Sequence, residues 1–105
     1  MLNINSMYKP TKGIAVDCSC LNGNPGDCEI RGIDIKTNSI LFSYKIQGKC
    51  TNNIAEFLAL VKGVQILINE NRWGEVVYSD SLTALSWYSK KKHKSKLIKI
   101  GRAHV

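Results

Sequence analysis

The hydrophobic residues of this 105-residue chain change their spacing once, from strand-like alternation to a helical period. In the first half, short apolar runs alternate with polar side chains and are bounded by turn-forming residues, which predicts β-strands. Dense turn signals at 22–26 and 36–39 separate these runs. The predicted strands span residues 12–20, 28–36 and 40–47. Because the turns are short, we expect an antiparallel meander.

In the second half, apolar residues at 52–70 recur near the 3.6-residue spacing of an amphipathic helix. Thr51 or Asn52 is a suitable N-cap for it. A short strand is expected at 75–79 and a second helix at 81–91. Since a helix separates the third and fourth strands, the fourth can join the sheet by a crossover. The order β-β-β-α-β-α predicts one α/β domain with a mixed sheet.

Length and composition narrow the class of protein. A chain of 105 residues with 44% hydrophobic residues is expected to form one globular domain with a small margin of stability. No apolar run approaches the ~20 residues of a membrane span, and residues 1–6 lack the apolar core of a signal peptide. We therefore expect a cytoplasmic protein that does not act at a membrane.

Four cysteines, at positions 18, 20, 28 and 50, raise the question of disulfides or zinc. Without a secretion signal, a disulfide framework is not favoured. The spacing of Cys18 and Cys20 is too close for a usual zinc pair, and no second pair follows. Reduced thiols, some of them buried, are the preferred interpretation, and zinc is a minor alternative.

The net charge of +7 comes from one end of the chain. Residues 1–89 hold eight basic and eight acidic side chains, whereas residues 90–105 hold seven basic side chains and no acidic one. Such a block is usually solvated and mobile. It can also neutralise phosphates and strengthen binding to nucleic acid. Composition alone favours the first interpretation.

Three short motifs each carry a carboxylate at a predicted element boundary. Asp17 and Asp80 end two apolar β runs, and Glu56 lies about one turn into the first predicted helix. Hard cations such as Mg²⁺ prefer oxygen ligands, and a pair of them can catalyse phosphoryl transfer. Each acid alone would more often be a cap or a turn residue. Together they predict a site for divalent metal ions.

The three motifs follow one another in the order Asp17, then Thr51-Asn52-Asn53-x-x-Glu56, then Asp80-Ser81. This order strongly resembles type 1 ribonuclease H of the bacterial type. The resemblance covers residues 12–96 and includes Asn24-Pro25-Gly26. Two departures are visible: Cys18 stands where the family has Gly, and the following loop is one residue longer. The resemblance implies a ribonuclease H-like fold.

The same resemblance suggests a domain organisation. The family continues with more helix, a fifth strand and a last helix, so this chain is expected to be truncated at the C-terminus, without its final strand and helices. Residues 1–11 are expected to be a flexible N-terminal segment. Residues 97–105, whose last part has no apolar period, are expected to be a non-native basic tail.

The resemblance also implies residue roles. Asp17, Glu56 and Asp80 would be the catalytic residues and the ligands of two Mg²⁺ ions, with Mn²⁺ as a substitute. The enzyme would cut the RNA strand of an RNA–DNA hybrid. No acid follows Asp80, so the family's fourth carboxylate is absent and impaired activity is expected. The expected substrate-binding residues are Asn24, Thr51, Asn52, Asn53, Ser81, Lys91 and Lys92.

Other interpretations stay open. A catalytically inactive module that binds RNA–DNA hybrids is the first alternative, because a carboxylate is missing. A monomer is expected, but an incomplete domain can also form a swapped or fragment-complemented dimer. Integrase-like and resolvase-like nucleases rank third, because they share three acids but not the Thr51–Glu56 motif. His93 and His104 are more easily explained as solvated side chains than as catalytic ones.

Overall fold

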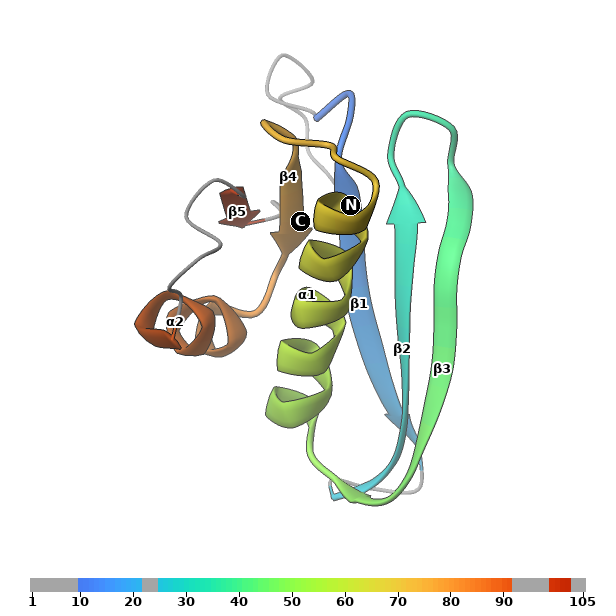
Figure 1. Cartoon of the computed structure of the whole chain (residues 1–105). Helices are drawn as coiled ribbons and strands as arrows, with labels where there is room; N and C mark the ends of the chain where they lie inside the picture. Colours follow the sequence, from blue (N-terminus) through green and yellow to red (C-terminus); the bar gives the residue numbers. More distant parts are fainter. Residues whose placement is uncertain (1–9, 22–24, 92–98, 103–105) are drawn as a thin grey trace.

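The computed structural model describes residues 10–21, 25–91 and 99–102. Its elements follow the order β-β-β-α-β-α-β along the chain, with one five-stranded sheet in the order β3-β2-β1-β4-β5. Figure 1 shows the long helix lying across one face of this sheet. The elements are β1 (Ile14–Leu21), β2 (Gly26–Asp34), β3 (Ser39–Cys50), α1 (Asn52–Asn69), β4 (Val76–Ser79), α2 (Leu82–Lys91) and β5 (Lys99–Arg102).

The first three strands form the expected antiparallel meander. In β1 and β2, Asp17 faces Arg31 and Cys20 faces Cys28. The turn between β2 and β3 is held by Asp34, whose Oδ2 accepts hydrogen bonds from the hydroxyl and the backbone N–H of Thr37 at 2.8 and 3.3 Å. Because both strand pairs alternate apolar and polar side chains, one face of the meander is buried and the other faces solvent.

Strand β4 lies parallel to β1, with Ile14 opposite Val77 and Ala15 opposite Tyr78. The connection through α1 makes this crossover possible, as the sequence predicts. α1 packs against β1, β2 and β4, and α2 packs beside α1. The predicted mixed α/β sheet is therefore confirmed, with element boundaries that differ by up to three residues from the expected ones.

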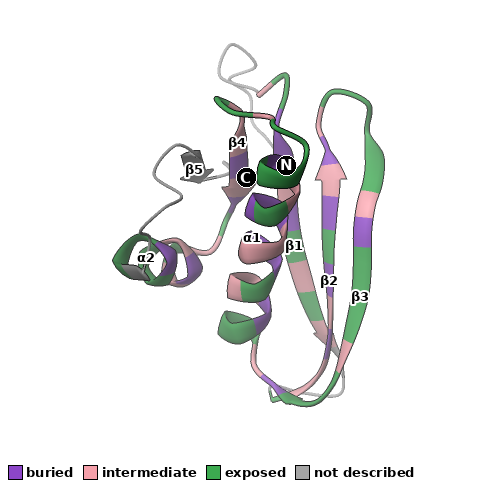
Figure 2. Ribbon diagram, viewed as in Figure 1, coloured by how far each residue is buried: buried purple, intermediate pink, exposed green. Residues whose placement is uncertain are grey.

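Two small side chains and a glycine let α1 approach the sheet closely. Ala55, Ala59 and Gly63 recur every four residues on one side of α1, and all three are buried. A Cβ atom added at Gly63 would lie 2.9 Å from Cγ1 of Val77 and 3.2 Å from Cγ1 of Val16. The helix thus rests directly on β1 and β4. Figure 2 shows the buried residues along this contact.

The core lies between α1 and the sheet, and the opposite face of the meander is open. Val16, Ile30 and Phe42 point toward the helix and are at most 5% exposed, whereas Asp17 and Arg31, next to them in sequence, are exposed. Ala15, between the buried Ile14 and Val16, lies on the other face and is partly exposed. Alternation along the strand explains the difference.

The structure corrects one prediction about the C-terminal part of the fold. A fifth strand was expected to be missing, but β5 lies parallel to β4, with Val76 opposite Lys99 and Ser79 opposite Arg102. These four residues fall inside the segment expected to be a non-native tail. Sequence pattern gives no sign of this strand, because Lys99–Arg102 contains a single apolar side chain. No helix of the described part is long and apolar enough to cross a bilayer.

Candidate active site

The carboxyl ends of β1, β3 and β4 lie at the same edge of the sheet. β1 and β3 both run antiparallel to β2, and β4 runs parallel to β1, so these three strands share one direction. Helix α1 begins two residues after β3 ends at Cys50, and therefore also begins at this edge. The strand order reverses between β1 and β4. In α/β sheets, the carboxyl ends of the strands at such a point are frequent ligand sites.

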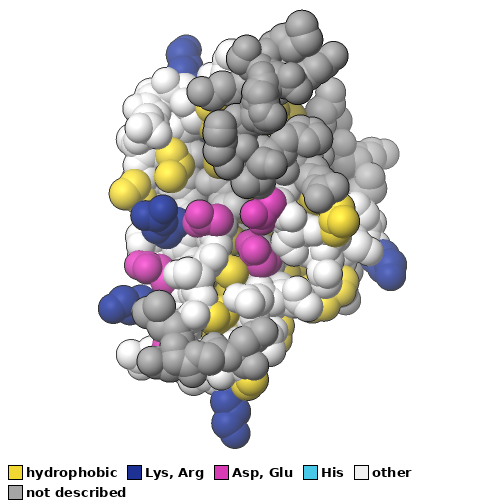
Figure 3. Space-filling model, turned by 180° about the vertical axis from the view of Figure 1, so that it is seen from behind, with side chains coloured by type: hydrophobic (Ala, Val, Ile, Leu, Met, Phe, Trp, Pro, Cys, Tyr) yellow, Lys and Arg dark blue, Asp and Glu magenta, His cyan; other side chains and the backbone are white. Residues whose placement is uncertain are grey.

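Asp17 and Asp80 reach this edge from neighbouring strands. The β1–β4 register pairs Ile14 with Val77 and Ala15 with Tyr78, so extending it by two residues brings Asp17 opposite Asp80. Asp80 follows directly after β4, and both carboxylates are exposed. Asp17 lies 3.9 Å from Nε of Arg31 across the β1–β2 pair. Figure 3, seen from behind, shows acidic side chains gathered on this face next to a basic one.

Glu56 approaches from the first turns of α1 and is only partly exposed. Its Oε1 atom is buried and has no hydrogen-bond partner among the described residues. Burial, reinforced by the negative charges of Asp80 and Asp17, raises the pKa of Glu56 to about 7. Like charges shift a pKa in this way only when they are close. The structure therefore brings Glu56, Asp17 and Asp80 into one electrostatically coupled group.

This group is compatible with divalent cations but does not form a complete cage for one. Within the described residues, no group of three His, Cys, Asp or Glu side chains stands in an arrangement that could hold a metal ion. Mg²⁺ seldom needs such a cage, since it keeps several waters and binds through one or two carboxylates plus substrate phosphates. The unpartnered oxygen of Glu56 and the exposed carboxylates of Asp17 and Asp80 suit that mode.

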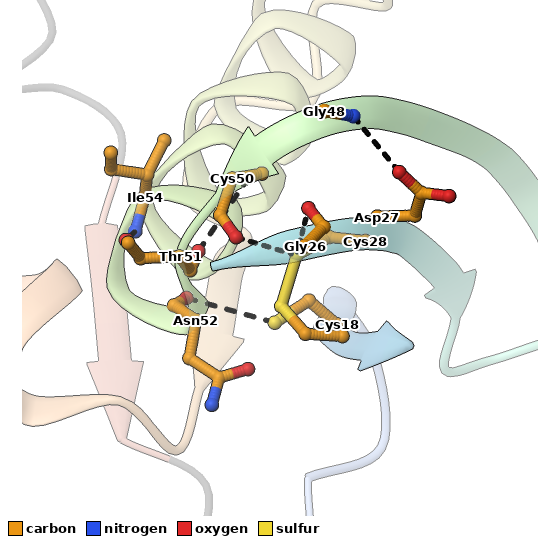
Figure 4. The surroundings of a disulfide bond; sticks show 10 residues. Cys18, Gly26, Asp27, Cys28, Gly48, Cys50, Thr51, Asn52 and Ile54 are labelled. Carbon is orange, nitrogen blue, oxygen red and sulfur yellow. Dashed lines mark hydrogen bonds between the residues drawn. A yellow bond between two sulfur atoms is a disulfide. The ribbon is translucent and has the colours of Figure 1, made fainter. Parts of the chain in front are cut away.

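Cys18 packs between β1 and the start of α1, a position that the sequence left without a role. Its Sγ donates to the backbone carbonyl of Asn52 at 3.7 Å, as Figure 4 shows. Burial, with the nearby charges of Glu56 and Asp17, raises the pKa of the Cys18 thiol to about 12. The group is therefore a neutral thiol at physiological pH.

The structure corrects the expectation that all four thiols are reduced. Cys20 and Cys28 form a disulfide between directly opposed positions of β1 and β2, while Cys18 and Cys50 are free. Sγ of Cys28 also lies 3.5 Å from the carbonyl oxygen of Cys50, so the bridge contacts the end of β3 (Figure 4). The missed signal was the register, which puts the two cysteines face to face across the strand pair.

The helix entry residues hold the start of α1. Oγ1 of Thr51 accepts a hydrogen bond from the N–H of Ile54 at 3.2 Å, which makes Thr51 the N-cap. Asn52 and Asn53 are exposed in the first turn. Their position beside the positive end of the helix dipole is a favourable one for a phosphate.

The remaining predicted substrate residues are less closely tied to the site. Oγ of Ser81 accepts from the N–H of Ala84 at 3.1 Å, so Ser81 caps α2 directly after Asp80. Lys91 is the last residue of α2. Asn24 and Lys92 lie outside the described residues. The structure thus brings Thr51, Asn52, Asn53 and Ser81 near the carboxylates through the elements they begin.

Sequence reasoning missed Arg31, which lies beside Asp17. The residue has no neighbour in sequence that marks it as functional, and only the β1–β2 register identifies it. A prediction of the strand pairing to single-residue accuracy would have been needed to find it.

No protein-family model matches this chain. Solved structures do match. The chain superposes on LC11-RNase H1 in complex with an RNA/DNA hybrid with a TM-score of 0.59 and 16% identity, covering 87% of this chain and 83% of that one. RNase H1 from the halophilic archaeon Halobacterium salinarum gives a TM-score of 0.57 and 16% identity over 90% and 84% of the two chains.

The N-terminal RNase H domain of a Mycobacterium tuberculosis protein, solved as a fusion with maltose-binding protein, gives a TM-score of 0.54. It is 18% identical, over 89% of this chain and 81% of that one. Identities this low establish the fold alone. The chain has the ribonuclease H fold, as the motif order indicates, with its three acidic residues at one edge of the sheet.

Proposed function

We propose that this chain is a ribonuclease H that hydrolyses the RNA strand of RNA–DNA hybrids with the help of divalent metal ions. The observation that carries the proposal is the coupling of three carboxylates from β1, α1 and the end of β4, which raises the pKa of Glu56 to about 7. A purely structural role does not explain three mutually repelling acids, one of them with an unpartnered buried oxygen. Bound cations would relieve this repulsion.

Asp17, Glu56 and Asp80 would hold the ions, with Mg²⁺ as the natural choice and Mn²⁺ as a substitute. Two bound divalent ions supply an activated water and stabilise the leaving oxygen in phosphodiester hydrolysis. The residues of this chain orient the reaction. Asp17 and Asp80, on adjacent strands, would hold the ions from the sheet, and Glu56 would hold them from α1. Ionised Glu56 is required, and because its pKa is about 7 before a cation binds, binding of the ions at or below that pH would release a proton.

The hybrid would lie with its backbone at the start of α1. Asn52 and Asn53 are exposed there, and the helix N-terminus favours phosphate oxygens. Recognition of hybrids by proteins rests on sugar and phosphate contacts and on groove shape rather than on base sequence. On the basis of the motif resemblance, we assign four further residues to the same interface: Asn24, Ser81, Lys91 and Lys92.

Cleavage of a labelled RNA–DNA hybrid in Mg²⁺ and in Mn²⁺ tests the proposal, with double-stranded RNA as the competing substrate. Asp17→Asn and Asp80→Asn should lose the activity. Glu70→Gln is the matched control, because Glu70 is exposed at the far end of α1 and should leave cleavage unchanged. Activity that persists in Asp17→Asn would contradict the assignment.

Impaired turnover is part of the proposal, because residues 81–105 contain no acid that could serve as a fourth carboxylate. A hybrid-binding module without catalysis is the second candidate, and the same missing acid favours it. Retained hybrid binding with no cleavage in either metal would select that alternative. Residues 12–96, with β5 added to their sheet, are proposed as the active domain, acting as a monomer. A molecular mass that rises with concentration would indicate a swapped or complemented dimer.

A further inference from the structure

Among the described residues, Arg31 is the basic residue that forms an ion pair with the acidic group, and it lies on the open face of the sheet. It stands directly opposite Asp17 in the β1–β2 register, so both side chains project to the same side. Its Nε atom is 3.9 Å from Oδ1 of Asp17, and the two side chains are 44% and 62% exposed. An ion pair this long and this solvated contributes little to stability.

Arg72 shows what a structural arginine looks like in this chain. Its guanidinium is 19% exposed and contacts Asp34 at 2.6 Å, Glu75 at 2.7 Å and Glu70 at 3.1 Å. Arg31, in contrast, makes one loose ion pair within the described residues. Most of its hydrogen-bonding capacity is therefore available, and a guanidinium presents several donors in a planar fork that matches phosphate oxygens.

We propose that Arg31 is a phosphate-binding residue that contacts the nucleic-acid backbone beside Asp17. The inference rests on the proposed function for the identity of the ligand, an RNA–DNA hybrid. In the free protein Arg31 pairs with Asp17; when cations occupy the carboxylate, the guanidinium is released to bind a backbone phosphate. Arg31 thus extends the interface from the start of α1 onto the outer face of β2.

The arrangement implies two effects of opposite sign. Removing the Arg31 charge takes away a phosphate contact, so hybrid binding weakens. It also removes a cation that competes for Asp17, so Mg²⁺ or Mn²⁺ binds more tightly. A residue that merely supports the fold would not produce this pattern. A diffuse loss of positive charge would produce it equally at any other exposed cation on the same face, so a second exposed lysine is needed as a control.

Hybrid binding is measured with the full chain in Ca²⁺, a hard cation that occupies oxygen-ligand sites, on hybrid verified to remain intact, so that binding is separated from catalysis. Arg31→Gln should weaken hybrid binding by about tenfold at low salt, the loss typical of one charge-assisted contact. The slope of log affinity against log salt should fall by about one unit. Arg31→Lys should retain the slope but lose part of the affinity, because the fork geometry is gone. Mn²⁺ titration should show half-saturation at a lower concentration in Arg31→Gln.

Lys45→Gln is the matched control. Lys45 lies on β3, is exposed on the same face of the sheet as Arg31, and pairs in register with Glu29 rather than with an acid of the site. Equal losses in Arg31→Gln and Lys45→Gln would overturn the proposal in favour of a diffuse electrostatic effect. A melting temperature within about 3 °C of the parent protein verifies folding, as expected for an exposed pair.

The two proposals fail in different ways. Cleavage by the parent chain with unchanged hybrid binding in Arg31→Gln would retain the nuclease and reject the role of Arg31. No cleavage with the expected binding loss would reject the nuclease and retain Arg31 as a hybrid contact. Absence of measurable hybrid binding by the parent chain would reject the role of Arg31 outright.

Discussion

Cys18 and Asn52, which are 34 residues apart in sequence, are joined by a contact of 3.7 Å between the thiol sulfur and the backbone carbonyl oxygen. This contact ties the acid-bearing part of β1 to the first turn of α1. The Cys18 thiol also lowers the pKa of Glu56, against the stronger opposing effects of burial and of Asp80 and Asp17. A residue that departs from the motif thus contacts the start of α1 and acts on the carboxylate of Glu56.

Replacement of Cys18 by alanine should raise the pKa of Glu56 further, because the interaction with this thiol lowers that pKa, whereas burial, Asp80 and Asp17 raise it. The acidic limb of the pH–rate profile for hybrid cleavage should then move to higher pH, by up to about one unit. Cys18→Ser, which keeps a donor, is the control and should move the limb less. A shift to lower pH in Cys18→Ala would contradict the assigned interaction.

The stability of the metal-free protein should fall as pH rises through the range from about 4.5 to about 7. Glu56 has a higher pKa folded than its ordinary value of 4.5, so the folded state holds the proton more tightly and loses that advantage on ionisation. Glu56→Gln should abolish this dependence and should stabilise the protein at pH 8 by about 1–2 kcal/mol, after allowance for solvent screening.

Urea unfolding in EDTA at pH 5 and pH 8 measures this difference. Glu70→Gln serves as the control, since Glu70 is exposed and far from the site. A parent protein and a Glu56→Gln variant with identical pH dependence would show that Glu56 does not titrate as assigned. Addition of Mn²⁺ at pH 8 should stabilise the parent and leave Glu56→Gln less affected, because the ion binds the ionised carboxylate.

Much of this fold and site follows from sequence because its signals are local. Alternation predicts β1, β2 and β3, the helical period predicts α1, and the Thr51 N-cap forms as the motif indicates. The order of the acids predicts their convergence, because β1 and β4 are parallel neighbours whose carboxyl ends share an edge with the start of α1.

The predictions that failed depend on pairing between distant residues. The Cys20–Cys28 disulfide and the Arg31–Asp17 pair follow from a register that no local pattern specifies. β5 was missed because Lys99–Arg102 is stabilised as a strand by its neighbour β4 rather than by its own composition. The raised pKa of Glu56 likewise reflects burial under tertiary contacts.

Gly32 should be intolerant of any side chain. A Cβ atom at this position would collide with Cε2 of Phe42, whose ring is 5% exposed and cannot swing freely into solvent. Gly32→Ala should destabilise the protein by about 1–3 kcal/mol, the usual cost of overpacking. In a double-mutant cycle, Phe42→Leu should recover part of the loss, so that the coupling energy is favourable. Additive effects in the cycle would contradict a direct clash.

Arg72 should be the most sensitive charged residue outside the site. It bridges Asp34, Glu70 and Glu75. Against the opposing effect of burial, hydrogen bonds from Thr37 and the Arg72 guanidinium together hold the pKa of Asp34 below its ordinary range, and Arg72 does the same for Glu75. Removal of the guanidinium in Arg72→Gln leaves the buried Asp34 carboxylate without its cation. We expect a loss of about 2–4 kcal/mol at pH 7, measured by urea unfolding.

The pH dependence of Arg72→Gln provides the second test of this assignment. A carboxylate with a lowered folded pKa contributes stability above its unfolded pKa near 4 and loses it as pH falls through the folded pKa. The difference between the parent protein and Arg72→Gln should therefore be full at pH 7 and shrink below about pH 4. Arg31→Gln is the matched control, because its exposed pair should cost less than about 1 kcal/mol at either pH. A loss that stays constant down to pH 2 would show that Arg72 stabilises the protein by packing rather than through Asp34 and Glu75.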